Sequence, residues 1–525
     1  MEGKNIVCSA YAEPSGESFE AINPATGKEL EGAFFKASSV DITNALNGAE
    51  IAFQTYKNID KDLKASFLRS IADEILSLGD ELISRAAAES GLPVARLQGE
   101  LGRTTGQLRL FADLVEEGSW VQAIIDPALP ERKPMPRADI RRMLVPLGPV
   151  VVFGASNFPL AFSVAGGDTA SALAAGCPVV VKAHPAHLGT SALVGSAIIK
   201  AIDKSGLPKG LFSLLYDSGY EVGAALVKHP KTKAVTFTGS FKGGNALIRL
   251  AQEREVPIPV FAEMGSINPI ILLPGALENR AEELAQKCAG SITQGSGQFC
   301  TNPGLMIAVQ SPALEKFKSA LAAAILASPS STMLTAGIFS NYSQLSKEIL
   351  DDNHIDLLAE STVINKELEC QPAARVALIS AKDFISSIKF QQEIFGPYSL
   401  LVTAKDAIEL QEVIGVLEGQ LTATLMAEPQ ELENYQELLN ELIDKTGRLI
   451  LNGVPTGVEV CAAMQHGGPH PATNDSRFTS VGSMAIYRFA RPVAWQDWED
   501  ELLPDALKAK NPLGIYRLVD QKWIK

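Results

Sequence analysis

The stretch Val150-Val-Val-Phe153 is the first of four short apolar runs in a chain of 525 residues. The other three are Pro178–Val181, Phe212–Leu215 and Ala234–Phe237. Runs of this length and β-branched content are typical of strands buried on both faces of a parallel sheet. Helical stretches rich in Ala and Leu, such as Thr190–Ile202, separate them. The alternation predicts βαβ units and a doubly wound α/β domain.

A second series of candidate strands follows and predicts a second α/β domain. Ahead of the first series, residues 40–92 repeat apolar side chains every three to four positions, which predicts helix. A chain of this length also exceeds what one hydrophobic core usually serves. The second series comprises Pro269–Leu272, Leu305–Val309, Leu400–Val402 and Leu449–Leu451.

Two segments outside both series, Arg141–Val145 and Ala485–Val493, are interpreted as exposed strands because basic residues alternate with apolar ones. A third segment, residues 144–167, carries no charge and is long enough to cross a bilayer. Three prolines would interrupt a spanning helix there, so a buried strand followed by a turn is the better interpretation. We expect no membrane association.

Composition narrows the class of protein. The net charge of −14 argues against nonspecific binding to nucleic acid or to anionic membranes, since like charges would meet. With 46% hydrophobic and 20% charged residues, the chain is globular in character. Its six cysteines lack paired or metal-like spacing, and its first residues lack the pattern of a signal peptide. We therefore expect free thiols and a cytoplasmic location.

The loop Gly295-Ser-Gly-Gln-Phe-Cys-Thr-Asn-Pro303 places one cysteine in a small polar segment after an apolar helical stretch. Most free cysteines behave as small buried hydrophobes, but a polar, glycine-rich loop is a poor place to bury one. Cysteine is also the most nucleophilic common side chain near neutral pH. We therefore expect Cys300 to react with a substrate.

Three further motifs accompany this loop: Phe153-Gly-Ala-Ser-Asn-Phe-Pro159, Phe237-Thr-Gly-Ser240 running to Gly244, and Phe261-Ala-Glu-Met-Gly265. Together the four motifs resemble the aldehyde dehydrogenase superfamily, and the resemblance extends over nearly the whole chain. It implies an aldehyde dehydrogenase-like α/β fold with two doubly wound domains. It also implies a small β sheet through which subunits form a homodimer or homotetramer.

The resemblance divides the chain into three parts. Without it, the two basic strands are interpreted equally well as solvated edge strands. The implied parts are a discontinuous cofactor-binding domain at 1–133 and 151–262, a catalytic domain at 263–484, and oligomerisation segments at 134–150 and 485–525.

A covalent mechanism follows from the resemblance. Attack by Cys300 on an aldehyde would give an alkoxide, which expels hydride to a nicotinamide and leaves a thioester. Asn157 and the backbone N–H of Cys300 would form the oxyanion hole, although an Asn before Phe-Pro is more often a turn residue. Glu263 would activate the hydrolytic water, with a pKa raised by its apolar neighbours. A strand-end glutamate in a salt bridge is the alternative.

The cofactor residues are also implied by the resemblance. A glycine-containing turn after a strand opens a helix whose backbone N–H groups can receive a pyrophosphate, though with 42 glycines such spacing also arises by chance. Gly239, Ser240 and Gly244 would form this turn. Lys182 would contact the adenosine ribose, and Glu393 and Phe395 would hold the nicotinamide ribose and ring.

The choice between NAD and NADP depends on the residue three positions after Lys182. Many NAD-specific relatives have a glutamate there, which repels a 2′-phosphate, whereas this chain has Pro185. Some NADP-preferring relatives have an arginine within the segment that corresponds to Tyr216–Val222, and this chain has none there. NADP is therefore slightly favoured over NAD.

Three segments are similar to a subgroup of the family that oxidises the semialdehyde of α-ketoglutarate, 2,5-dioxopentanoate. They are Gly297–Gly304, Lys182–His187 and Gln465–Ala472. That substrate ends in an α-keto acid, so an arginine in the access tunnel could bind its carboxylate in bidentate fashion. Arg103 falls where relatives have an apolar tunnel residue, and Phe158 is the second expected substrate contact. A surface arginine on a helix is an equally good interpretation of Arg103.

Other functions remain open from the sequence. A medium- or long-chain fatty aldehyde, which would require a wholly apolar tunnel, and succinate semialdehyde are the nearest alternative substrates. A coenzyme A-acylating enzyme would not need Glu263 as a hydrolytic base. A catalytically idle binding protein would have no physical reason to keep the whole catalytic set.

His466 and His470 raise the question of a metal site. No cysteine or acidic residue completes a metal-binding spacing in the sequence around them, and the Pro-rich surroundings predict a loop. We therefore expect no metal.

Overall fold

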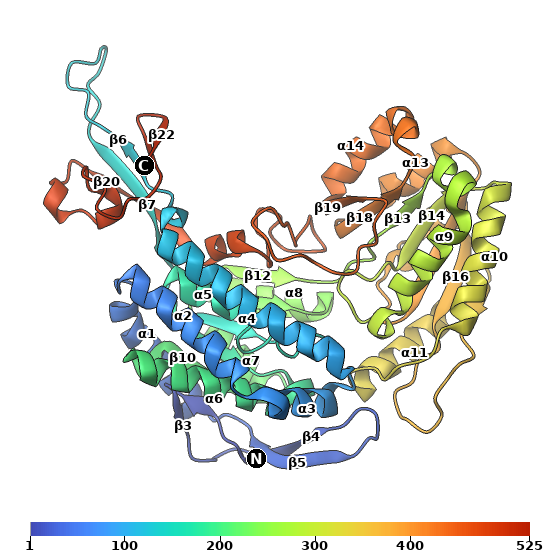
Figure 1. Cartoon of the computed structure of the whole chain (residues 1–525), viewed down its shortest axis with the longest axis horizontal. Coiled ribbons are helices and arrows are strands. Elements are labelled where there is room, and N and C mark those ends of the chain that lie inside the picture. The colour runs from blue at the N-terminus through green and yellow to red at the C-terminus, as the bar shows by residue number, and fades with distance from the viewer. Residues whose placement is uncertain (1) are drawn as a thin grey trace.

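The computed structural model of the chain describes residues 2–525. Figure 1 shows two α/β lobes side by side and a slender arm that projects from the first lobe. The strands of these residues form four sheets: two of seven strands, one of five strands in the arm, and one of three strands near the N-terminus. The last of these contains β1 (Glu2–Gly3), β4 (Ser18–Ile22) and β5 (Glu29–Phe35).

The first lobe is built on a seven-stranded sheet in the order β12-β11-β8-β9-β10-β2-β3. The five strands from β12 to β10 are parallel, as the βαβ alternation predicts, and β2 joins them antiparallel. All four strands predicted in this region are present. The strands are β2 (Ile6–Val7), β3 (Ala10–Tyr11), β8 (Val150–Phe153), β9 (Val179–Lys182), β10 (Phe212–Leu215), β11 (Ala234–Thr238) and β12 (Val260–Glu263).

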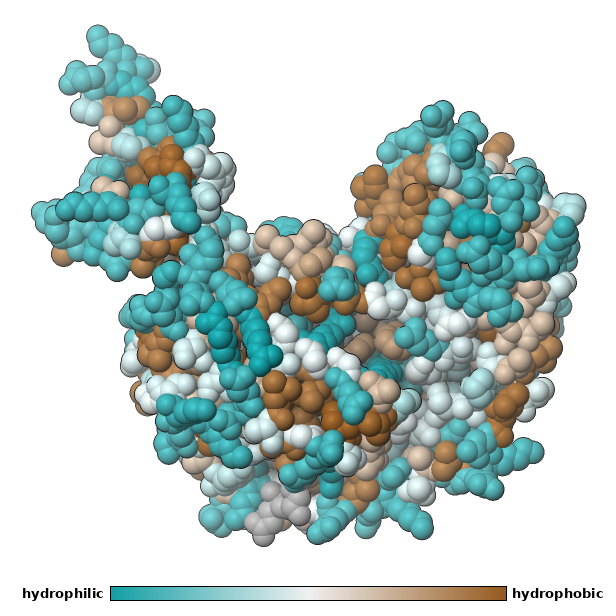
Figure 2. All heavy atoms as spheres, in the orientation of Figure 1, coloured by the Kyte–Doolittle hydropathy of each residue, from teal (hydrophilic) through white to brown (hydrophobic). Residues whose placement is uncertain are grey.

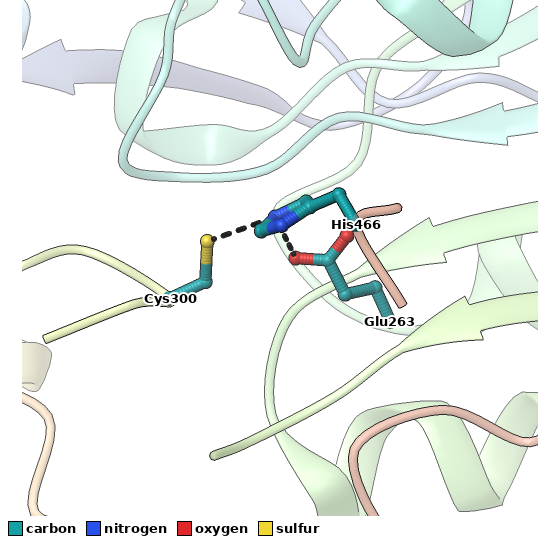
Figure 3. A group of neighbouring side chains, drawn as sticks. All are labelled: Glu263, Cys300 and His466. Atoms are coloured by element: carbon teal, nitrogen blue, oxygen red, sulfur yellow. Dashed lines mark hydrogen bonds and ion pairs between the residues drawn. The ribbon is translucent and has the colours of Figure 1, made fainter. Parts of the chain in front are cut away.

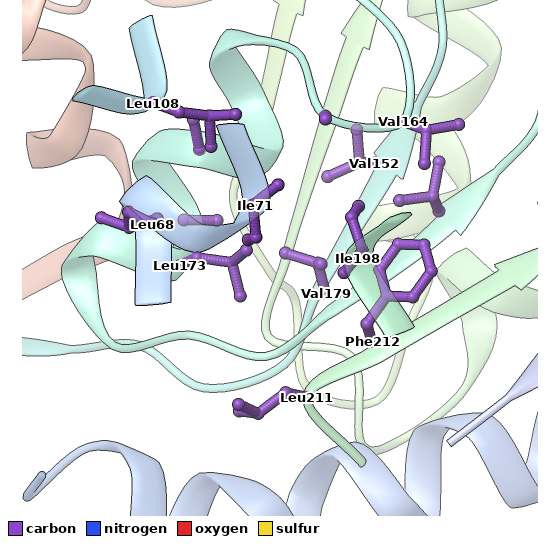
Figure 4. Close-up of a cluster of buried hydrophobic side chains, with 14 of the residues drawn as sticks. Leu68, Ile71, Leu108, Val152, Val164, Leu173, Val179, Ile198, Leu211 and Phe212 are labelled. Carbon is purple, nitrogen blue, oxygen red and sulfur yellow. The ribbon is translucent and has the colours of Figure 1, made fainter. Parts of the chain in front are cut away.

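Helices cover both faces of this sheet because successive strand residues point to opposite sides. Val150 and Val152 pack with α2, α4, α5 and α6 in one core, shown in Figure 4, whereas Val151 packs with α1, α7 and α8 in another. Full burial of each such valine is worth about 1.5–3 kcal/mol. The helices are α1 (Ser39–Tyr56), α2 (Lys61–Leu76), α3 (Gly79–Ser90), α4 (Val94–Glu117), α5 (Gly167–Ala175), α6 (Leu188–Ser205), α7 (Glu221–Lys228) and α8 (Phe241–Gln252).

The helical pattern of residues 40–92 forms three helices with defined ends. Ser38 caps α1 in a capping box with Asp41, and Asp60 caps α2. Gly91 ends α3 in the left-handed conformation.

The second lobe has a sheet in the order β15-β16-β17-β14-β13-β18-β19, parallel except for β15. Helices α9 and α10 pack on one face and α11 to α14 on the other. The strands are β13 (Ile270–Leu272), β14 (Leu305–Val309), β15 (Asp356–Glu360), β16 (Arg375–Ser380), β17 (Tyr398–Ala404), β18 (Gln420–Met426) and β19 (Thr446–Leu451). The helices are α9 (Pro274–Thr293), α10 (Pro312–Ala327), α11 (Ala336–Leu350), α12 (Ala381–Ser386), α13 (Ala407–Val416) and α14 (Gln436–Lys445).

The arm sheet pairs the two basic strands that lie far apart in sequence, since β7 and β20 are antiparallel neighbours. The expected strand over residues 485–493 is only half correct, because residues 483–489 form a 3-10 helix whose apolar side chains pack against the first lobe. No helix among the described residues is both long and apolar enough to span a membrane. The arm strands are β6 (Ile124–Asp126), β7 (Ile140–Pro146), β20 (Ala490–Gln496), β21 (Arg517–Val519) and β22 (Lys522–Ile524).

Candidate active site

The cysteine loop, residues 294–304, connects α9 to β14 and has left-handed backbone at three consecutive residues before Cys300. One of these residues is Gly297, with φ of 63°. A Cβ at Gly297 would lie 2.2 Å from the carbonyl oxygen of Gly396, so only glycine allows this approach. The cysteine loop is therefore held against residues 393–397, which include two of the predicted cofactor residues.

Asn268 fixes the backbone around the cysteine. Its Nδ2 donates to the carbonyl oxygens of Cys300 and Asn302, at 2.9 Å each. Ser266, which stands where the resembled motif has glycine, donates to Oε1 of Gln420 at 2.8 Å. These side-chain bonds join the end of β12, the cysteine loop and β18 into one rigid unit.

Cys300, His466 and Glu263 meet at the junction of the two lobes (Figure 3). The Nε2 atom of His466 lies 3.4 Å from Sγ of Cys300 and 3.0 Å from Oε1 of Glu263. Both His466 and Glu263 are buried, and Cys300 is half-buried. Ser480 donates a short hydrogen bond to the other carboxylate oxygen of Glu263. The sequence predicted two of these four residues.

The surroundings set the pKa values of the acid and the thiol. Burial raises the pKa of Glu263, but the charge and hydrogen bond of His466, with hydrogen bonds from Ser480 and Cys300, outweigh burial and hold that pKa below its ordinary value. The expectation of a raised pKa is therefore wrong, because it considered only the apolar sequence neighbours. Burial and the charge of Glu263 raise the pKa of the Cys300 thiol well above its ordinary value. The thiol thus needs a proton acceptor before it can react.

His466 lies in a long irregular segment, residues 452–482, that passes between the lobes. Its backbone N–H donates to Oγ1 of Thr479 at 2.9 Å, and Met264 N donates to Ala472 O at 2.7 Å. The predicted loop is confirmed. No cysteine or acidic residue accompanies His466 in the nearby sequence, but the structure brings donor atoms of Glu263, Cys300 and His466 within 4.8 Å of one another. These partners are distant in sequence and only the tertiary structure unites them.

Asn157 lies at the end of β8 and is buried. Its Nδ2 donates to the carbonyl oxygen of Gln298, two residues before Cys300, at 3.2 Å. An amide has two N–H donors, so a second remains for another acceptor. The structure therefore brings Asn157 to the cysteine loop, where the sequence expectation requires it.

The predicted pyrophosphate site is the turn from β11 to α8. Ser240 caps α8 by accepting from Gly243 N at 3.2 Å, and residues 239–242 are exposed. The first turn of a helix leaves backbone N–H groups without intrahelical partners, which suits an anionic pyrophosphate. Gly244 has a packing role as well, because a Cβ there would lie 2.7 Å from the side chain of Met264.

The remaining predicted cofactor residues come from both lobes. Lys182 ends β9, is buried, and donates to Asp217 O at 3.3 Å. Glu393 and Phe395 line a pocket with Ser266 next to the cysteine loop. Burial raises the pKa of Glu393 to about 7. The carboxylate, the lysine and the open helix end form a set of groups that fits a ribose and pyrophosphate, as a nicotinamide dinucleotide requires.

Comparison with known proteins agrees with this geometry. The sequence model of the aldehyde dehydrogenase family matches residues 11–347. The chain is 49% identical, over 99% of both chains, to alpha-ketoglutaric semialdehyde dehydrogenase 2 of Azospirillum brasilense. It is 47% identical to alpha-ketoglutaric semialdehyde dehydrogenase of Acinetobacter baylyi, over 99% of this chain and 98% of the relative. This chain belongs to the aldehyde dehydrogenase family.

The fold comparison gives the same result. A 1-pyrroline-5-carboxylate dehydrogenase from Thermus, solved with bound NAD, superposes with a TM-score of 0.78 at 22% identity, covering 94% of this chain and 93% of that one. The predicted α/β fold is thus confirmed. The protein is an oxidoreductase that acts on aldehydes.

In this aldehyde dehydrogenase, two arginines of α4 pack against phenylalanine rings from other segments next to Cys300. The guanidinium of Arg103 lies over the rings of Phe158 and Phe162, with 5.8 and 5.4 Å to the centroids. Arg96 lies over Phe158 and Phe299, at 5.2 and 4.7 Å. Such cation–π contacts hold a partly desolvated charge. Arg103 is therefore not the exposed surface arginine that the alternative interpretation required.

Sequence reasoning missed four residues of this site. Arg96 donates to Asn157 O at 2.8 Å, and Glu100 accepts from the backbone N–H groups of Leu160 and Ala161. The spacing of Arg96, Glu100 and Arg103 along α4 puts them on one helix face, which was a usable signal. The other two are Ser480, for which the sequence offered no local signal, and His466, which was considered from the sequence only as a possible metal ligand.

Proposed function

We propose that this enzyme oxidises 2,5-dioxopentanoate to 2-oxoglutarate with NAD(P) as the hydride acceptor. The two relatives at 49% and 47% identity are named for the oxidation of this semialdehyde. In the proposal Cys300 is the nucleophile, Asn157 is the oxyanion donor and Glu263 is the base that activates water. Arg103 binds the substrate carboxylate, and Phe158 lies beside the substrate chain.

The observation that carries the substrate assignment is the unpaired guanidinium of Arg103. Its Nε and Nη2 atoms are buried and have no hydrogen-bond partner anywhere in residues 2–525. Buried donors without partners are costly, and cationic ones most of all. A carboxylate can satisfy two of them at once in a bidentate pair. A fatty aldehyde would leave both donors unpaired, whereas the α-keto acid end of 2,5-dioxopentanoate would satisfy them.

Each of these residues has its own step in the proposed reaction. The Cys300 thiolate attacks the aldehyde carbon, and the second amide N–H of Asn157 stabilises the alkoxide. A bound nicotinamide supplies the hydride acceptor. Glu263, whose lowered pKa keeps it ionised at neutral pH, then accepts a proton from the water that attacks the thioester.

We further propose that NADP is accepted as well as NAD and is slightly preferred. Pro185 is exposed just after Lys182 and offers no negative charge to repel a 2′-phosphate. The nearby Asp217 carboxylate accepts from Gly219 N and Val222 N at 2.9 Å each, so it is engaged within its own turn. The ratio of kcat/KM for the two cofactors tests this preference.

We also propose a role for each lobe and for the arm sheet. The first lobe binds the cofactor, the second carries Cys300, and the arm sheet joins subunits into a homodimer or homotetramer in the cytoplasm. Figure 2 shows apolar side chains gathered over β19 and α14 on the side of the second lobe that faces the arm. The exposed apolar residues there are Ile443, Leu449 and Leu451, and such a patch favours association. Light scattering after gel filtration distinguishes monomer, dimer and tetramer.

The substrate proposal is tested by initial rates of NADPH and NADH formation with 2,5-dioxopentanoate, succinate semialdehyde and hexanal. We expect the highest kcat/KM with 2,5-dioxopentanoate and no turnover by Cys300→Ala. Preference for hexanal would overturn the substrate assignment and leave the covalent mechanism intact. Absence of turnover with every substrate and both cofactors would overturn the mechanism as well.

A further inference from the structure

His466 contacts the reacting sulfur and the proposed hydrolytic base with the same atom. Its Nε2 lies 3.4 Å from Cys300 Sγ and 3.0 Å from Glu263 Oε1 (Figure 3). We propose that His466 is the base that takes the thiol proton of Cys300 before attack and returns it to the sulfur when the thioester opens. Glu263 is then left to activate water. This division of labour does not depend on which aldehyde is the substrate.

The thiol also donates a hydrogen bond to Glu263, but electrostatics favour the histidine over the carboxylate as the first proton acceptor. A thiolate formed beside the ionised Glu263 would be repelled by it, which is one reason the pKa of the thiol is raised. When Nε2 of His466 holds the proton, the resulting imidazolium lies between two anions, the thiolate and the carboxylate, and is attracted by both. The proton transfer therefore places a cation between the thiolate and the Glu263 carboxylate, which would otherwise repel each other.

The proton balance is closed within the site. The S–H bond of Cys300 breaks, its electron pair stays on sulfur, and an N–H bond forms at Nε2 of His466. After hydride leaves the alkoxide, water attacks the thioester and gives one proton to Glu263. The C–S bond breaks, and the departing thiolate of Cys300 regains the proton from Nε2. The net protons of aldehyde oxidation leave through the acid product and Glu263.

The imidazole is fixed in the orientation that this role requires. The backbone of His466 is bonded on both sides, because its N–H donates to Thr479 Oγ1 and its carbonyl oxygen accepts from Ser480 N, at 2.9 Å each. Its Nδ1 is buried and has no hydrogen-bond partner in the described part of the chain. To accept the thiol proton, the neutral imidazole carries its own proton on Nδ1, which leaves the lone pair of Nε2 facing Sγ.

Three other charged residues, Arg103, Glu393 and Arg448, interact with the Cys300 thiol. Arg103 and Glu393 act on the Cys300 thiol in opposite directions, and Arg448 lies near enough to interact with it. None of these three makes a hydrogen bond to Sγ among the residues that the structure describes. They shift the pH at which the thiol ionises, but they do not take its proton.

The test measures the rate at which iodoacetamide alkylates Cys300 in the holoenzyme, from neutral pH to about pH 10. We expect His466→Gln and His466→Phe to lower the rate at neutral pH by about 10²-fold and to move the profile to higher pH, with rescue at alkaline pH. Cys300→Ala gives the background from the other five cysteines. His470→Gln is the matched control, since His470 is in the same segment and its ring contacts Phe241 instead.

Single-turnover kinetics provide the second readout. The His466 variants should slow the first burst of NADPH, which reports formation of the thioester, whereas Glu263→Gln should leave the burst and slow the steady state. Wild-type pH profiles of alkylation and of the burst in both His466 variants, with native melting temperatures, would overturn the proposal. A loss of rate equal at every pH would also overturn it, because it would show a structural role only.

Discussion

The cysteine loop and the segment 452–482 supply opposite walls of one active site, yet they are built in different ways. The cysteine loop is short, and its conformation is set by left-handed backbone at residues 295–297 and by side chains that bond its carbonyl oxygens, among them Asn268 and Asn157. The segment 452–482 has almost no regular structure and is fixed by bonds to both lobes. The proposed nucleophile could therefore be inferred from its own loop, whereas the position of its proposed acid–base partner depends on distant elements.

Removal of the proposed nucleophile in the cysteine loop should have the largest effect on turnover. Cys300→Ser is expected to lower kcat by at least about 10⁴-fold, because an alkoxide is far harder to form than a thiolate near neutral pH. Steady-state NADPH formation measures the loss. Residual activity above one tenth of wild type would show that another group attacks the aldehyde.

The second largest effect is expected at Asn157, the proposed oxyanion donor. Asn157→Ala should lower kcat by about 10²–10³-fold with little change in cofactor binding. Asn157→Asp is a stringent companion variant, since it keeps the size but places negative charge beside the alkoxide. If both variants retain wild-type kcat, the amide of Asn157 has only its structural bond to Gln298 O.

Arg103→Met should raise KM for 2,5-dioxopentanoate by about 30-fold, because a charged hydrogen bond is worth about 2 kcal/mol. The KM for hexanal should not rise. Arg109→Met is the control on the same helix, since Arg109 pairs with Asp73 at the surface. An equal change for both aldehydes in Arg103→Met would remove the carboxylate contact from the proposal.

Asn268 holds the cysteine loop and Thr479 holds His466, so substitutions at these two residues compare the two walls of the site. Asn268→Ala leaves two carbonyl oxygens of the cysteine loop without their donor, and Thr479→Val leaves the backbone N–H of His466 without its acceptor. Each should cost about 1–3 kcal/mol of unfolding free energy. Chemical denaturation measures it. We expect both variants to slow the burst, Thr479→Val through displacement of His466 and Asn268→Ala through displacement of Cys300. An unchanged burst in either variant would show that its anchor is not needed for catalysis.

The smallest effect concerns Glu393, on the far side of the cysteine loop. Its folded pKa of about 7 lies above that of an unfolded glutamate, near 4.3. The folded state therefore binds more protons between these values, and this residue lowers stability as pH rises through that window. The full shift would correspond to about 3–4 kcal/mol. Because the side chain is partly exposed, solvent screening reduces this figure, and Glu393→Gln should gain about 1–2 kcal/mol relative to wild type at pH 8 compared with pH 4. Thermal melts of the cofactor-free protein would contradict this if the difference did not depend on pH.

Much of the fold was predictable because buried parallel strands are continuous apolar runs. Val150–Phe153 and Leu305–Val309 were predicted with their observed bounds. The strand β18 was missed, because Gln420-Leu-Thr-Ala-Thr alternates polar and apolar residues although every residue of the strand is buried. Its Gln420 side chain faces the polar network behind the cysteine loop, so tertiary contacts override the usual pattern.

By itself, the sequence determined the α/β fold and the family and led to Cys300 as the proposed nucleophile, because these depend on local patterns: strand-length apolar runs, glycines that permit left-handed turns and a cysteine among them. Only the tertiary structure decided the surroundings of that cysteine. His466 and Glu263 are about 200 positions apart in the chain and meet at Nε2 and Oε1, 3.0 Å apart. The direction of the Glu263 pKa shift follows from that contact, since charge and hydrogen bonding act over ångströms in space and not over positions in sequence.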